Sequence, residues 1–183
     1  IEALFQAGAH IGYGKARKHR TMSEYIFSTR NNVEIFDLEQ TLAKIREAEE
    51  FLCSLGREGK IVLWVGTKPA SSPHIERIAA RLNLPYVEKR WLGGTITNFK
   101  VIGGRLAYWQ KMEEDKKTGK FEKYVKKERI KKEAELVKLG LAFTGLRTLK
   151  KIPDVIIIVD PKEEKTALRE AFTTKIPVIA LLN

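Results

Sequence analysis

The stretch RWLGGTITNFK, residues 90–100, marks the boundary between two structural patterns: an alternating series of strands and helices ends there, and a long, lysine-rich helical segment begins. Its tryptophan is large and apolar and predicts a buried anchor. Its two glycines permit positive φ or close backbone approach, and a threonine or asparagine can cap the following helix. We interpret the stretch as a rigid hinge. The predicted hinge residues are Trp91, Gly93, Gly94, Thr97, Asn98 and Phe99.

The residues before this hinge alternate between helix and strand patterns. Asp37 is an N-cap candidate for a helix whose apolar residues recur at helical spacing. Residues 61–65 form a continuous apolar run, as expected of a buried parallel strand, and Ser72 followed by Pro73 opens a second helix. Residues 86–87 supply a short third strand. This order predicts helices packed on a parallel sheet.

Two helical patterns separated by a polar turn follow the hinge. The second carries Ile130, Ala134, Val137 and Leu141, flanked by Leu136, Leu139, Phe143 and Leu146, so that its apolar residues recur three and four residues apart. We expect these seams to pack against the first helix as an antiparallel helical hairpin, similar to a coiled coil.

The sheet pattern then resumes. Residues 155–159 are a second continuous apolar strand, Asp160 and Pro161 predict a capped helix, and residues 178–182 predict the final strand. The predicted fold class is α/β, a doubly wound and mostly parallel sheet of the Rossmann-like or flavodoxin-like kind, with an inserted helical hairpin. The predicted domains are residues 1–99 with 152–183, and the insertion 100–151.

The positive charge is segregated along the chain. The net charge is +11, and residues 100–151 hold sixteen Lys or Arg against seven Asp or Glu. Residues 1–30 hold five against two, whereas the other segments are nearly neutral. A segregated excess of one sign beside neutral, core-forming segments indicates a polyanion site, and nucleic acid is the leading candidate. An anionic membrane is less favoured, because neither basic segment has a wide apolar face.

A glycine-rich, cationic loop, residues 7–20, is suited to close approach of phosphates. Together with the hinge and the hairpin it supplies the candidate RNA contacts. These are Lys15, Arg17, Lys18, His19, Arg20, Arg30, Arg90, Lys100, Arg105, Lys126, Lys127, Lys131 and Lys132.

Enzymatic chemistry has little support in the sequence. Residues 66–72, GTKPASS, hold neither a P-loop nor a dinucleotide fingerprint, so no nucleotide cofactor is predicted. The three histidines show no metal-ligand spacing with Cys53, and no metal or catalytic residue is predicted. Cys53 stands among apolar residues and predicts a packed thiol. No apolar run reaches the roughly 18 residues that cross a bilayer.

Three separated motifs resemble one family. RWLGGTITNFK resembles the form RWLGG, two variable residues, TNF, of bacterial-type small-subunit ribosomal protein two. The string AGAHIG at residues 7–12 and residues 155–183 resemble the same family, although Tyr13 stands where the family commonly has histidine.

The resemblance implies a non-enzymatic constituent of the small ribosomal subunit that binds its ribosomal RNA near the junction of head and body and supports translation. The implied partners are small-subunit ribosomal RNA and neighbouring small-subunit proteins, among them the largest, with no membrane contact. The implied location is the cytoplasmic ribosome. The alternatives are a nucleotide-dependent enzyme on the same fold and a free RNA-binding regulator.

Overall fold

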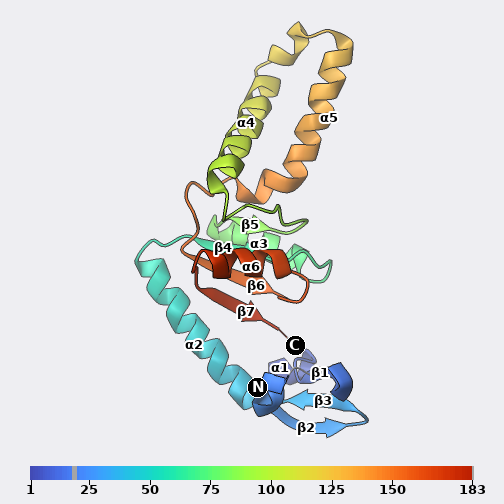
Figure 1. Cartoon of the computed structure of the whole chain (residues 1–183), viewed down its shortest axis with the longest axis vertical. Helices are drawn as coiled ribbons and strands as arrows, with labels where there is room; N and C mark the ends of the chain where they lie inside the picture. The colour runs from blue at the N-terminus through green and yellow to red at the C-terminus, as the bar shows by residue number, and fades with distance from the viewer. Residues whose placement is uncertain (18–19, 183) are drawn as a thin grey trace. The chain divides into compact units, whose positions relative to one another are not determined.

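In the computed structural model, which describes residues 1–17 and 20–182, the chain forms two units, residues 1–59 and 60–182. In the first, a short helix and three strands precede one long helix (Figure 1). Its elements are α1 (Glu2–Gln6), β1 (Ile11–Gly14), η1 (Lys15–Arg17), η2 (Arg20–Tyr25), β2 (Ile26–Arg30), β3 (Val33–Phe36) and α2 (Leu38–Arg57).

The three strands form an antiparallel sheet in the order β1-β3-β2. Arg30 pairs with Val33 across a two-residue turn. Both turn residues, Asn31 and Asn32, have positive φ, 48° and 63°. Asparagine tolerates this conformation, and a turn with two such residues matches the twist of a β-hairpin.

The long helix α2 begins where its cap predicts. The Asp37 carboxylate accepts hydrogen bonds from the backbone N–H of Glu39 at 2.9 Å and of Gln40 at 3.4 Å. The predicted packing of Cys53 is wrong, because this side chain is exposed. It follows Leu52 by one residue, and each residue turns about 100° around the helix, so the thiol points away from the apolar side.

The second unit holds the predicted α/β sheet and hairpin (Figure 1). Its elements are β4 (Val62–Val65), α3 (Ser72–Leu82), β5 (Tyr86–Val87), α4 (Phe99–Lys117), η3 (Lys120–Lys123), α5 (Lys126–Phe143), η4 (Thr144–Leu146), β6 (Val155–Val159), α6 (Lys165–Thr173) and β7 (Val178–Leu181). All strand pairs in the order β5-β4-β6-β7 are parallel. The predicted fold class is therefore confirmed.

Helices cover both faces of this sheet. Leu63, Val65 and Ile156 belong to a buried cluster that includes Ala167 and Ala171 of α6. The other face of the sheet is covered by α3. Gly66 follows Val62 and Trp64 in the alternation and therefore faces the same side as they do. A Cβ at Gly66 would come within 2.4 Å of the side chain of Ile75, which belongs to α3. Because successive strand residues point to opposite faces, α3 and α6 lie on opposite sides, as in a doubly wound fold.

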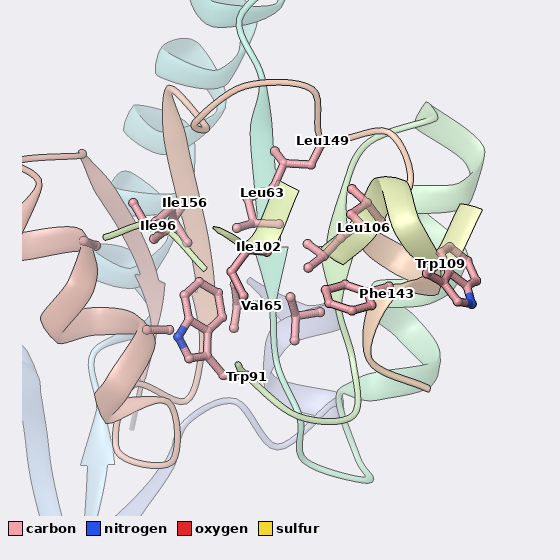
Figure 2. Close-up of a cluster of buried hydrophobic side chains, with 14 of the residues drawn as sticks. Leu63, Val65, Trp91, Ile96, Ile102, Leu106, Trp109, Phe143, Leu149 and Ile156 are labelled. Carbon is pink, nitrogen blue, oxygen red and sulfur yellow. The ribbon is translucent and has the colours of Figure 1, made fainter. Parts of the chain in front are cut away.

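The same buried cluster continues into the base of the hairpin. Ile102 and Leu106 of α4 and Phe143 of α5 pack with Leu63 and Val65 (Figure 2). The hairpin base and the sheet thus share one hydrophobic core. The sequence suggests that residues 100–151 form a separate domain, and this assignment stays a prediction.

The predicted hairpin seams are correct only in part. Ile130, Val137 and Leu141 are 56%, 63% and 57% exposed, whereas Leu136 and Phe143 are buried. Leu136 and Phe143 belong to one buried cluster with Trp109 and Met112 of α4. Two apolar stripes at helical spacing compete on α5, and packing on α4 buries the flanking one, which includes Leu136 and Phe143.

The start of α6 also differs from the prediction. This helix begins at Lys165, and Asp160 adopts a positive φ of 61° in a turn, so Pro161 does not open the helix. The sequence places Ala167, Leu168, Ala171 and Phe172 on one apolar side of this helix; Ala167 and Ala171 are buried, whereas Phe172 is 69% exposed.

Candidate nucleic-acid interface

Two candidate cations of the first unit, Lys15 and Arg30, lie at the same end of its sheet. Lys15 directly follows β1, and its N–H donates to the Asn32 carbonyl at 3.1 Å. Arg30 immediately precedes that turn, and both Lys15 and Arg30 are exposed. The fold therefore brings Lys15 and Arg30 together from opposite ends of a 16-residue stretch.

Three further candidates and His19 belong to the same loop. Arg17 ends η1, and Arg20 begins η2 with its side chain exposed. Lys18 and His19 lie outside the described residues.

The hairpin candidates separate into two groups. Lys126, Lys127, Lys131 and Lys132 lie on the first two turns of α5, at the tip of the hairpin, whereas Lys100, Arg105 and Arg90 lie near its base. All are exposed except Lys132, which is half-buried with its Nζ 4.6 Å from the centre of the Tyr124 ring. Lys123 of η3, which the sequence reasoning missed, is also exposed at the tip.

The hinge is organised by a carboxylate that the sequence analysis did not select. Glu170 of α6 is 7% exposed. Its Oε1 accepts from Trp91 Nε1 at 3.0 Å and from the Gly94 N–H at 2.7 Å. Its Oε2 accepts from the N–H groups of Ile96 and Thr97 at 3.0 and 3.1 Å and from the Thr97 hydroxyl at 3.1 Å. The Glu170 side chain thus connects the hinge to helix α6 by hydrogen bonds.

This arrangement sets the protonation state of Glu170. Burial alone raises its pKa, but the hydrogen bonds from Trp91 Nε1 and the backbone of Gly94, Ile96 and Thr97 favour the charged form more strongly. The net result is a lowered pKa, so Glu170 remains a carboxylate acceptor near neutral pH.

Trp91 and Gly94 have the roles expected of them in the hinge, whereas the two candidate helix caps, Thr97 and Asn98, do not. Trp91 is buried at 8% exposure, in agreement with the expected anchor (Figure 2). Gly94 has a φ of 88°, where a glycine is favoured. Neither Thr97 nor Asn98 caps α4 with its side chain; Asn98 occupies the N-cap position without such a bond, and the Thr97 hydroxyl is used by Glu170.

The carboxyl ends of β4 and β6 are where doubly wound proteins bind nucleotides. In this protein, side chains that follow β4 bind to side chains that follow β6 across these strand ends. The Glu164 carboxylate accepts from the Thr67 N–H at 2.7 Å and from its hydroxyl at 2.6 Å. Lys68 forms an ion pair with Asp160. Two carboxylates at this place oppose an incoming phosphate, so the alternative of a nucleotide-dependent enzyme gains no support.

The described residues contain no group of three or more His, Cys, Asp or Glu side chains placed to hold a metal ion. His10 instead stacks on Phe5, with ring centroids 4.2 Å apart. Among the helices of the described chain, none is long and apolar enough to span a membrane.

The fold and these surfaces define a class: a basic α/β protein whose nucleotide position is occupied by its own side chains and whose cations lie on exposed loops and on a helical hairpin. Comparison with known families matches residues 4–183 to the family described as Ribosomal protein S2. The chain belongs to this family, whose members are structural, non-enzymatic constituents of the small ribosomal subunit.

Curated relatives agree along the full length of the chain. A small ribosomal subunit protein uS2 from Dictyoglomus thermophilum is 46% identical over 183 residues, which cover 100% of this chain and 74% of the relative. A protein of the same name from Roseiflexus sp. is 39% identical, covering 100% and 70%. The small ribosomal subunit protein uS2c of Cyanophora paradoxa is 38% identical, covering 100% and 78%.

Proposed function

We propose that this constituent of the small ribosomal subunit binds small-subunit ribosomal RNA near the junction of head and body, and that it supports translation in the cytoplasm. The observation that carries the proposal is the segregated charge: residues 100–151 hold sixteen cationic against seven acidic side chains, and residues 1–30 hold five against two. Neighbouring small-subunit proteins, among them the largest, are the proposed protein partners.

Two surfaces supply the RNA contacts. On the first unit, Lys15, Arg20 and Arg30 are exposed on the loop and at the sheet end. On the second, Lys126, Lys127 and Lys131 project from the start of α5. Flexible cations on exposed segments neutralise phosphates, and each contact releases condensed counterions.

The remaining candidates take lesser parts in the proposal. Lys132 is held against Tyr124 and contributes charge from a fixed position. Arg90, Lys100 and Arg105 lie at the base of the hairpin, so they can meet only a different part of the RNA from the tip lysines.

The salt dependence of binding to a small-subunit ribosomal RNA fragment tests this mechanism. We expect affinity to fall steeply with salt, and the triple variant K126Q/K127Q/K131Q to lower the log-log slope by about one for each phosphate that is no longer neutralised. The variant K15Q/R20Q/R30Q tests the other surface. The matched control R81Q/K165Q/R169Q removes the same charge from α3 and α6, which carry none of the candidate RNA-binding residues, and it is expected to leave the slope unchanged.

A salt slope near zero, or equal decreases in the control and the two surface variants, contradicts phosphate binding at these residues. Co-sedimentation with small subunits at raised salt distinguishes a constituent from a free RNA-binding regulator. Footprinting of the ribosomal RNA on subunits containing the protein tests the head-body position: protections confined to another region reject it.

A further inference from the structure

Phe27 of β2 has the largest exposed fraction, 77%, among the large apolar side chains of the described residues. Within this part of the chain no other ring stacks on it, and no cation lies over its face. Exposure of a whole phenylalanine ring forgoes the free energy that its burial would contribute. A ligand that covers the ring recovers this free energy on binding.

The backbone of β2 presents this ring to solvent. β2 is an edge strand, because it pairs only with β3 in the order β1-β3-β2. Ile26 pairs with Phe36 and Ser28 pairs with Ile35, so the register shifts and Phe27 has no partner on β3. A bulge of this kind re-aims a side chain, and bulges are frequent at sheet edges and beside functional sites. The outward position of Phe27 is therefore a property of the strand.

Hydrogen bonds fix the strand on both sides of the bulge. Before it, the Tyr25 carbonyl accepts from the Asp37 N–H at 2.9 Å. After it, Thr29 pairs with Glu34 in the ladder between β2 and β3. A ring carried on a fixed backbone loses less conformational freedom on binding than a ring on a mobile loop.

Two cations of the RNA surface proposed for the first unit flank Phe27 along the chain. Arg20 begins η2, which leads directly into β2, and Arg30 ends β2. Both side chains are exposed. Arg30 follows Phe27 by three residues, which is about 10 Å of extended strand. Sites for single-stranded nucleic acid combine cations along the backbone with rings on which bases stack, and this segment of the chain has both.

We infer that Phe27 is a stacking platform for an unpaired base of RNA, and that Arg20 and Arg30 neutralise phosphates next to this base. The inference rests on the proposed RNA binding and adds the class of RNA that this surface takes, which is a loop, a bulge or a single-stranded end. Bases in such segments can be splayed out and stacked on an aromatic side chain. Bases within a regular duplex are already stacked on their neighbours and leave the ring uncovered.

The surroundings of Phe27 favour a base over a protein partner. Ser28 and Thr29, which follow it on β2, are polar, and Arg30 comes next. A stable protein interface buries about 800 Å² on each partner, and charged residues are depleted at its centre. A single ring between cations lacks that area and that composition, whereas it matches the size of one base.

The test measures the affinity of the whole chain for two RNAs. One is single-stranded oligoadenylate of about ten nucleotides, which is within the size range of single-strand sites, and the other is the same strand paired with oligouridylate. F27A is expected to weaken binding of the single strand at least about fivefold, the lower end of the effect of base–aromatic stacking. Its affinity for the duplex is expected to stay unchanged. The log-log salt slope is also expected to stay unchanged, because stacking releases no counterions.

Further variants separate stacking from simple apolar contact. F27L keeps an apolar side chain without a ring face and is expected to lose as much affinity as F27A. F27W is expected to retain the affinity, and its added tryptophan emission to be quenched by the single strand. The matched control F172A removes a phenylalanine that is 69% exposed on α6, a helix without candidate RNA-binding residues, and is expected to bind both RNAs like the unchanged chain.

Several results would overturn the inference: no binding of the single strand, unchanged affinity in F27A, full affinity in F27L, or equal losses on the single strand and the duplex. An equal loss in F172A shows that the effect is not specific to Phe27. A clearly lower melting temperature of F27A shows that the ring is part of the folded core, and a self-association that F27A abolishes assigns the ring to protein. The proposed function fails on a different result, a salt slope near zero for the unchanged chain, so the two failures are distinguishable.

Discussion

Replacing Glu170 by Gln tests the central contact of the hinge. The glutamine retains one acceptor oxygen and presents an NH₂ group where the other stood. If the NH₂ group stands in place of Oε2, the backbone N–H groups of Ile96 and Thr97 have no acceptor. If it stands in place of Oε1, Trp91 Nε1 and the Gly94 N–H have no acceptor. Each orphaned donor costs about 1 to 3 kcal/mol. Removing a buried charge offsets part of this cost, so we expect E170Q to lower the free energy of unfolding by about 3 kcal/mol.

The measurement is thermal or urea unfolding followed by tryptophan fluorescence. All three tryptophans, Trp64, Trp91 and Trp109, lie in the second unit, so the signal reports that unit. For a protein of this size, a destabilisation of about 3 kcal/mol lowers the melting temperature by about 6 to 12 °C. The matched control is E163Q, which removes an exposed carboxylate from the turn before α6.

The pH dependence gives a second readout of the same contact. The folded pKa of Glu170 is lowered, so the unfolded chain takes up the proton first. The stabilisation is therefore present in full above the unfolded pKa of about 4.3 and disappears as the pH falls through the folded value. The variant E170Q lacks this contribution. Equal melting temperatures for E170Q and E163Q, or an unchanged acid limb, would refute the role assigned to Glu170.

Further predictions concern single contacts of the second unit. G145A is expected to destabilise it by about 2 kcal/mol, because the new Cβ would meet the Tyr86 carbonyl and backbone must move; the control G104A, where nothing lies within 4 Å, is expected to stabilise by about 0.5 to 1 kcal/mol. A urea melt in which both variants behave alike would show that the close approach at Gly145 is tolerated. W91A is expected to cost about 3 to 5 kcal/mol as a large-to-small core change, and a small shift in its melting curve would contradict the anchor.

Local chemistry accounts for most of what the sequence predicted. The runs at 61–65 and 155–159 are continuous and apolar, and both form buried parallel strands. The start of α2 could be predicted from Asp37, because its capping hydrogen bonds reach residues only two and three positions further along the chain. Such features depend on neighbours in the chain and need no knowledge of the rest of the fold.

The candidate RNA-binding residues were found by charge, which is also a sequence property. The structure adds their grouping, since Lys15 meets the turn after Arg30, and the tip lysines separate from those at the hairpin base. Which of them bind RNA stays a prediction, because exposure is common to bound and solvated cations.

Periodicity, caps and composition are local, so the sequence predicted the strands and helices of the second unit, the place of the hinge and the segregation of charge. Which stripe of α5 is buried, and which carboxylate holds the hinge, depends on tertiary packing. Both stripes have helical spacing, and packing against Trp109 settles the choice. Glu170 is 79 residues from Trp91 in the chain, and no local pattern distinguishes it from other helical glutamates until the fold brings its carboxylate to the donors of the hinge.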